Sequence, residues 1–77
     1  MAIKVHFRLR LIKDSSPHRF EWMFDNDKKE YLKSDVDQWI VALRADNDKV
    51  KLGHGTLTAD KGSRLRLAEY LETVIDC

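Results

Sequence analysis

The sequence has very few of the residues that cross-link a chain or break its regular structure. It contains one cysteine, Cys77, together with one proline and three glycines among 77 residues. One cysteine cannot form a disulfide within the chain, so we expect a reducing, cytoplasmic setting. Because proline and glycine are scarce, flexible linkers have little room, and we expect one domain over residues 1–77.

Long apolar runs and an excess of one charge are also missing. No stretch is apolar enough to cross a bilayer, and charges interrupt the N-terminal segment, so we expect neither a membrane span nor a signal peptide. The chain has 14 basic and 13 acidic side chains, for a net charge of +1. This balance excludes a strong overall attraction to nucleic acid or to an anionic membrane.

Two segments with strict alternation predict an antiparallel hairpin. Apolar and polar residues alternate over residues 2–12 and again over residues 18–25, and turn formers at residues 14–17 separate them. The register that brings the apolar residues together on a buried face also matches opposite charges on the outer face, whereas a shift by two residues would keep the faces but weaken that charge match. The favoured register pairs Phe7 with Phe24, Leu9 with Trp22 and Leu11 with Phe20. The outer face then pairs Arg10 with Glu21, Arg8 with Met23, His6 with Asp25 and Lys4 with Asp27.

The segment after the hairpin predicts a short strand and a helix. Residues 30–33 are expected to add a third strand, and Ser34 is expected to cap a helix over residues 35–45. The apolar spacing of this helix predicts one buried stripe. Its members are Val36, Trp39, Ile40 and Leu43.

The last third of the chain predicts a strand and a second helix. Residues 50–52 form a short strand, which Gly53-His54-Gly55 interrupts or bends and which resumes at residues 56–58. Asp60 or Ser63 caps the final helix, and its charged residues, Arg64 among them, are expected to face water. The predicted class is α+β, in the order β-β-(β)-α-β-α, with both helices on one face of an antiparallel sheet. The expected core comprises Val5, Phe7, Leu9, Leu11, Phe20, Trp22, Phe24, Trp39, Ile40, Leu43, Leu67, Leu71 and Val74.

Two apolar residues and a group of acids indicate a surface for a protein partner. The run WIVAL at residues 39–43 is longer than a buried helix face requires, so Val41 falls outside that face. Met23 lies on the outer face of the predicted hairpin. The acids are expected to face a basic partner, or else to cap and solubilise the turns where they lie. The candidate protein-binding residues are Met23, Asp25, Asp27, Glu30, Asp35, Asp37 and Val41.

The basic outer face of the hairpin is the alternative candidate surface. Residues 1–20 carry five basic side chains and one acidic side chain. The candidate nucleic-acid contacts are Lys4, Arg8, Arg10, Lys13 and Arg19. The predicted pairing sets acids opposite most of this face, which weakens the field that a phosphate would meet. The element order over residues 2–45, a hairpin, a short third strand and a helix with a tryptophan, resembles the small DNA-binding domains of some phage integrases and of plant AP2 proteins. The resemblance implies a sheet face that enters the major groove.

The sequence has no residue set typical of catalysis or metal binding. Asp25-Asn26-Asp27 begins like a calcium loop, but Lys29 and Glu30 stand where a ligand and a glycine are needed. The three histidines have no short metal-binding spacing. Gly53-His54-Gly55 matches neither a P-loop nor a dinucleotide fingerprint. We therefore expect no enzyme activity, no metal and no cofactor.

By elimination, the sequence favours a small non-catalytic protein-binding module. An accessory, adaptor or inhibitor protein fits this description, such as a phage or mobile-element protein that blocks a larger host complex. We expect a monomer or a homodimer that binds another protein. The alternative hypothesis is a nucleic-acid-binding domain that uses the basic face of the N-terminal hairpin.

Overall fold

The computed structural model describes residues 6–12 and 18–76. Predictions on Lys4, Val5, Lys13 and Cys77 lie outside these residues. The expected α+β class is confirmed, and the described helices are both too short or too polar to cross a membrane. The elements are β1 (Phe7–Ile12), β2 (Arg19–Phe24), β3 (Asp27–Leu32), α1 (Lys33–Arg44), β4 (Lys49–Leu52), β5 (Gly55–Thr58) and α2 (Lys61–Ile75).

The first three strands form one antiparallel sheet in the order β1-β2-β3. The predicted hairpin register is confirmed, with Leu9 opposite Trp22 and Arg10 opposite Glu21. Burial restricts the register, because a shift by one residue would turn Leu9, Trp22 and their apolar neighbours to the other side of the sheet. A shift by two residues would keep the faces but would weaken the match of charges on the outer side. On the outer side, Arg10 Nη2 lies 3.1 Å from Glu21 Oε1, in the expected ion pair.

The third strand is longer than predicted and begins earlier. It spans Asp27–Leu32 instead of residues 30–33, and it pairs with β2 from its first residue, Asp27 opposite Phe24. A two-residue turn, Asp25-Asn26, makes this early pairing possible. Asp25 has a φ of 60°, a value that aspartate tolerates better than most residues.

Helix α1 also begins earlier than predicted. It spans Lys33–Arg44, so Ser34 lies in its first turn and the N-cap position belongs to Leu32. The Asp35 carboxylate accepts a hydrogen bond from the Leu32 backbone N–H at 3.2 Å. An acid three residues after the cap can satisfy this N–H, so Asp35 takes over the capping that the sequence analysis assigned to Ser34.

Residues 49–58 form a second hairpin, whereas the sequence predicted one bent strand. Strands β4 and β5 pair antiparallel, with Leu52 opposite Gly55, so Gly53-His54 is a two-residue turn. Gly53 has a φ of 68°, which glycine adopts without the steric cost that a side chain brings. This hairpin adds three buried residues that the predicted core lacked: Val50, Leu52 and Leu57.

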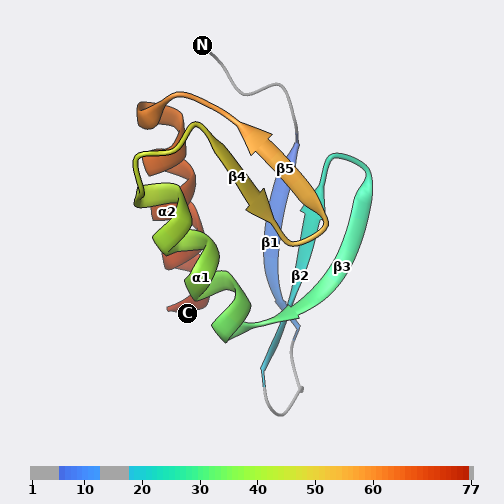
Figure 1. Ribbon diagram of the computed structural model, residues 1–77. Helices are drawn as coiled ribbons and strands as arrows, with labels where there is room; N and C mark the ends of the chain where they lie inside the picture. Colours follow the sequence, from blue (N-terminus) through green and yellow to red (C-terminus); the bar gives the residue numbers. More distant parts are fainter. Residues whose placement is uncertain (1–5, 13–17, 77) are drawn as a thin grey trace.

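The second hairpin and both helices enclose one core with the inner face of the first sheet. Figure 1 shows α1 and α2 side by side, with the β4–β5 hairpin in front of the three-stranded sheet. Trp22 joins the two sheets, because its indole N–H donates to the Leu52 carbonyl at 3.1 Å. The buried apolar residues are Leu9, Phe20, Trp22, Val36, Trp39, Ile40, Leu43, Val50, Leu52, Leu57, Leu67, Ala68 and Leu71.

Helix α2 covers the free edge of β1. The Leu9 backbone N–H donates to the Tyr70 hydroxyl oxygen at 2.8 Å, and that hydroxyl lies 3.4 Å from the Leu9 carbonyl. An edge strand exposes unpaired backbone groups, and such groups can pair with other chains. Tyr70 therefore satisfies Leu9 and blocks the middle of this edge.

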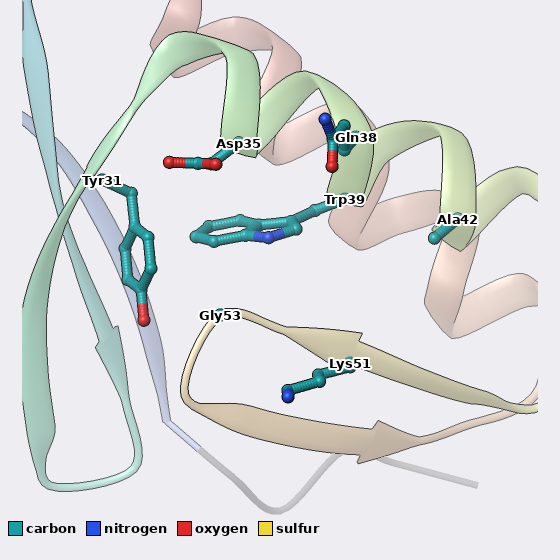
Figure 2. A pocket seen from close by; sticks show the side chains of 7 residues that line it. All are labelled: Tyr31, Asp35, Gln38, Trp39, Ala42, Lys51 and Gly53. Carbon is teal, nitrogen blue, oxygen red and sulfur yellow. The ribbon is translucent and has the colours of Figure 1, made fainter.

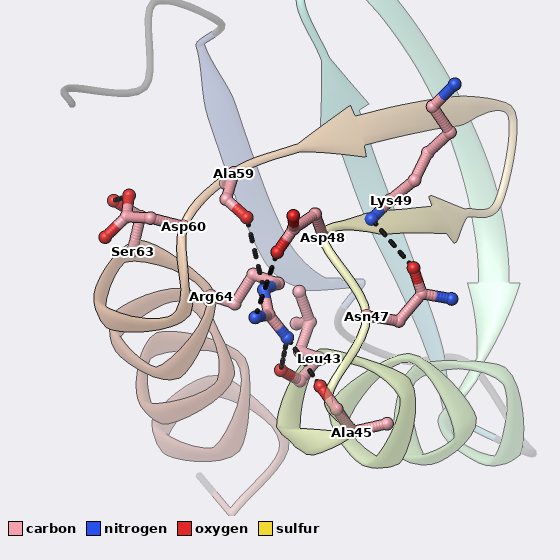
Figure 3. Close-up of polar contacts among 9 residues, drawn as sticks. All are labelled: Leu43, Ala45, Asn47, Asp48, Lys49, Ala59, Asp60, Ser63 and Arg64. Atoms are coloured by element: carbon pink, nitrogen blue, oxygen red, sulfur yellow. Dashed lines mark hydrogen bonds and ion pairs between the residues drawn. The ribbon is translucent and has the colours of Figure 1, made fainter.

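Arg64 is buried, although the sequence predicted that it would face water. Its side chain is 2% exposed and lies between α2 and the end of α1 (Figure 3). The guanidinium donates to the carbonyls of Leu43, Ala45 and Ala59. Since the last carbonyls of a helix lack partners within it, a cation at the end of α1 satisfies them and complements the helix dipole.

Candidate functional site

The outward side of α1 carries a shallow apolar groove. Val41 is 71% exposed there, as the helical spacing of the WIVAL run predicted, because its neighbours Trp39, Ile40 and Leu43 point into the core. The groove has a volume of about 370 Å³. We call it the α1 groove, and it is lined by Asp37, Gln38, Val41, Ala42 and Ala45.

A second hollow adjoins the α1 groove and has a more varied lining. Its volume is about 330 Å³, and Gln38 and Ala42 belong to both hollows, so they form one continuous surface. We call this hollow the aromatic pocket (Figure 2). It is lined by Tyr31, Asp35, Gln38, Trp39, Ala42, Lys51 and Gly53, which come from β3, α1, β4 and the turn after β4.

Tyr31 is held in place from two sides. Its ring meets the Trp39 ring edge to face, with centroids 4.8 Å apart, and stacks parallel to the His54 ring at 6.0 Å. His54 Nε2 lies 3.1 Å from the Asp27 carbonyl oxygen, which can only accept, so Nε2 carries the proton. Nδ1 is then free to accept from the Tyr31 hydroxyl at 3.0 Å. These contacts give the pocket a preformed aromatic wall.

Gly53 lets the β4–β5 turn approach this wall closely. A Cβ atom at Gly53 would lie 2.6 Å from Tyr31 Cζ and 2.9 Å from Trp39 Cζ2, well inside van der Waals contact. A side chain at this position would therefore displace one of the two rings. The Gly53-His54-Gly55 motif thus shapes the pocket as well as the turn.

The acidic side of the pocket affects the Tyr31 hydroxyl. Burial, and then the negative charge of Asp35, raise the pKa of Tyr31 above 10.0, against the opposing effect of the hydrogen bond with His54. Tyr31 is therefore a neutral hydroxyl at physiological pH. The Asp35 carboxylate lies beside Tyr31 in the lining of the pocket (Figure 2).

The seven candidate protein-binding residues fall in three places. Asp35, Asp37 and Val41 line the α1 groove or the aromatic pocket. Asp25 and Asp27 lie at the β2–β3 turn, and α1 starts at the opposite end of β3 (Figure 1). The other two, Met23 and Glu30, lie on the outer face of the sheet. The structure therefore separates Asp25 and Asp27 from the acids near the start of α1, whereas Glu30 and Asp35 line one hollow together with Arg19.

The candidate nucleic-acid residues that the structure describes share the outer sheet face. Pairing places Arg8 and Arg10 beside Arg19 on this face, and the longer β3 adds Lys28 to it. Two acids oppose them: Arg10 pairs with Glu21, and Arg19 Nη1 lies 3.7 Å from Glu30 Oε1. The half-buried Met23 lies between Arg8 and Lys28 in one cross-strand row.

Sequence reasoning missed most of the aromatic pocket. Trp39 was assigned to the core alone, and Lys51 and Gln38 received no role. No local pattern marks these residues, because the pocket exists only where separate elements meet. Across residues 6–12 and 18–76, no three histidine, cysteine, aspartate or glutamate side chains lie together in a way that would hold a metal ion.

Comparison with known proteins adds no relative to this description. No protein-family model, curated protein or solved structure matches the chain.

Proposed function

We propose that this chain is a small non-catalytic module that binds another protein through the α1 groove, as an accessory, adaptor or inhibitor. The exposure of Val41 in the middle of a folded helix carries the proposal. Val41, Ala42 and Ala45 form an apolar strip, and polar residues border it at Asp37 and Gln38. An apolar strip with a polar rim is the usual layout of a protein interface. The single cysteine fits a partner in the cytoplasm.

The experiment compares protein capture by the wild type and by a Val41→Glu variant. A carboxylate at Val41 would remain in water in the free protein, so the fold should be unaffected, but it would be buried on binding. Thr73→Glu is the matched control, because it places the same group on an exposed position of α2. We expect a specific protein to bind the wild type and Thr73→Glu and to be lost with Val41→Glu. If all three capture the same proteins, the α1 groove is not the binding surface.

The outer sheet face supports a second candidate function, nucleic-acid binding. The observation in its favour is that Arg8, Arg10, Arg19 and Lys28 share one face that neither the helices nor the second hairpin covers. Ion pairs with Glu21 and Glu30 reduce the charge available to phosphates, so this function ranks second.

A mobility-shift assay at low salt decides between the two functions. A sheet-face binder would retard a DNA or RNA probe, its affinity would fall steeply as salt rises, and an Arg8→Glu/Arg10→Glu variant would lose binding while staying folded. Absence of any shift at low salt would remove this second function. A shift that the double variant retains would show that the outer sheet face does not carry it.

A further inference from the structure

The aromatic pocket combines two aromatic rings with a carboxylate that has no ion-pair partner in the part of the chain that the structure describes. Among the described residues, Asp35 takes part in no ion pair, and its one hydrogen bond comes from the Leu32 N–H. Asp37, two residues further along α1, already pairs with Lys33 at 3.4 Å. The pocket therefore keeps a carboxylate beside the Tyr31 and Trp39 rings that no ion pair within the described residues neutralises, although it also caps the start of α1 and lines a neighbouring hollow with Arg19.

This lining suits a cation better than an anion or a neutral group. Ring faces attract arginine and lysine side chains through the aromatic quadrupole, and a nearby carboxylate adds a charge-assisted hydrogen bond. Gln38 offers an amide oxygen as a further acceptor. Lys51, the one cation in the lining, lies beyond Trp39 and Gly53 from Asp35 in Figure 2.

We propose that the aromatic pocket holds an arginine or lysine side chain of the protein that docks on the α1 groove. The proposal rests on the proposed function and extends it, because the groove and the pocket share Gln38 and Ala42. The partner then carries an apolar residue over Val41 and a basic residue a short distance along the same segment. The paired rings and Gly53 preform the pocket, so little rearrangement accompanies binding.

The test is a ¹H–¹⁵N NMR titration with Nα-acetyl-arginine methylamide, and the matched acidic probe is Nα-acetyl-glutamate methylamide. The indole N–H of Trp39 reports on the pocket. The indole N–H of Trp22 is an internal reference, because it is buried and bonded to Leu52. We expect saturable shifts at Trp39 and the Gly53 amide with the arginine probe only, and no shift at Trp22.

Charge variants then identify the side chains responsible. Asp35→Asn should weaken binding of the arginine probe by about three- to tenfold, and Lys51→Glu should strengthen it by a similar factor. Lys61→Glu makes the same charge change on α2, away from the pocket, and should leave the affinity unchanged. Lys51→Glu is the more informative variant, because, unlike Asp35→Asn, it leaves the hydrogen bond between Asp35 and the Leu32 N–H at the start of α1 unchanged.

Three results would overturn the proposal: no shift at Trp39, an equal response to the glutamate probe, or equal effects of Lys51→Glu and Lys61→Glu. Failure here is distinct from failure of the proposed function. If Val41→Glu abolishes capture but the arginine probe does not bind, only the pocket assignment is wrong. If the probe binds but Val41→Glu captures the same proteins as the wild type, the pocket assignment stands, and the proposal that the α1 groove is the binding surface is wrong.

Discussion

Replacing Arg64 with alanine tests how the second half of the chain is held together. The Arg64 guanidinium donates to carbonyls in three places: Nε to Ala59 at 3.2 Å, Nη1 to Leu43 at 3.4 Å, and Nη1 also to Ala45. The Ala59 carbonyl lies in the link between β5 and α2, and the Leu43 and Ala45 carbonyls lie at the end of α1. One side chain therefore joins both helices to the segments that flank the second hairpin.

The expected cost follows from the loss of these bonds and from the space left behind. A hydrogen bond from a charged donor contributes about 1.5–3 kcal/mol, and water can recover part of this at the half-exposed carbonyls. Removing a side chain that is 2% exposed also leaves a cavity. We expect Arg64→Ala to lower the free energy of unfolding by about 3–5 kcal/mol. A chain of 77 residues has roughly 4–12 kcal/mol in total, so the variant should be close to unfolding.

Urea unfolding followed by tryptophan fluorescence measures this loss. Arg66→Ala is the matched control, because Arg66 is exposed on the same helix, and it should change stability by less than about 0.5 kcal/mol. Asp48, whose Oδ1 lies 3.6 Å from Arg64 Nη2, has a side chain that is 83% exposed. Asp48→Ala should therefore cost less than about 1 kcal/mol.

The controls also give the result that would refute this account. If Asp48→Ala costs as much as Arg64→Ala, the ion pair holds Arg64 and the carbonyls do not. A loss of less than about 1 kcal/mol for Arg64→Ala would show that the buried guanidinium contributes little. Arg64→Lys should fall between the wild type and alanine, because lysine keeps the charge but not the planar set of donors.

Three further predictions concern the first sheet and the aromatic pocket. Tyr70→Phe leaves the Leu9 N–H without its partner, so it should cost about 1–3 kcal/mol and speed hydrogen exchange at the Leu9 amide. Burial and a nearby carboxylate raise the pKa of Tyr31 above 10.0, so the folded state holds this proton more tightly. The free energy of unfolding should fall as pH rises from 10.0 towards the folded-state pKa of Tyr31. Urea unfolding at several pH values measures this fall, and the Tyr31→Phe variant should lack the contribution of Tyr31 to it. Gly53→Ala should cost about 2–4 kcal/mol in thermal unfolding, whereas Gly62→Ala should change stability by less than about 1 kcal/mol.

Local periodicity was sufficient to predict the first hairpin and the buried face of α1. Alternation with period two assigns each side chain to a face, and the match of charges on the outer face favours the register that places Leu9 opposite Trp22. Helical spacing likewise predicted that Val41 would be exposed while Trp39 was buried. These features depend on side-chain direction, which a short segment determines by itself.

The ends of helices and the types of turn were less predictable, because neighbouring residues can often serve equally well as a helix cap or as a turn. Ser34 and Asp35 are both good capping residues, and the structure uses Asp35. Gly53-His54-Gly55 suits a bent strand as well as a hairpin turn. The pairing of Leu52 with Gly55 decides for the turn, because it brings Leu52 and its neighbours into the core.

The sequence by itself determined the α+β class, the basic outer face of the sheet and the exposed apolar residue on α1. Only the tertiary structure decided that Arg64 is buried, since two of the three carbonyls that hold it come from the end of α1, about twenty residues earlier in the chain. The same holds for the aromatic pocket, which takes Tyr31, Trp39 and Lys51 from three different elements. Patterns with periods of two and 3.6 residues give the direction of a side chain. Which side chains come into contact with one another depends on how elements that are distant in the sequence pack together.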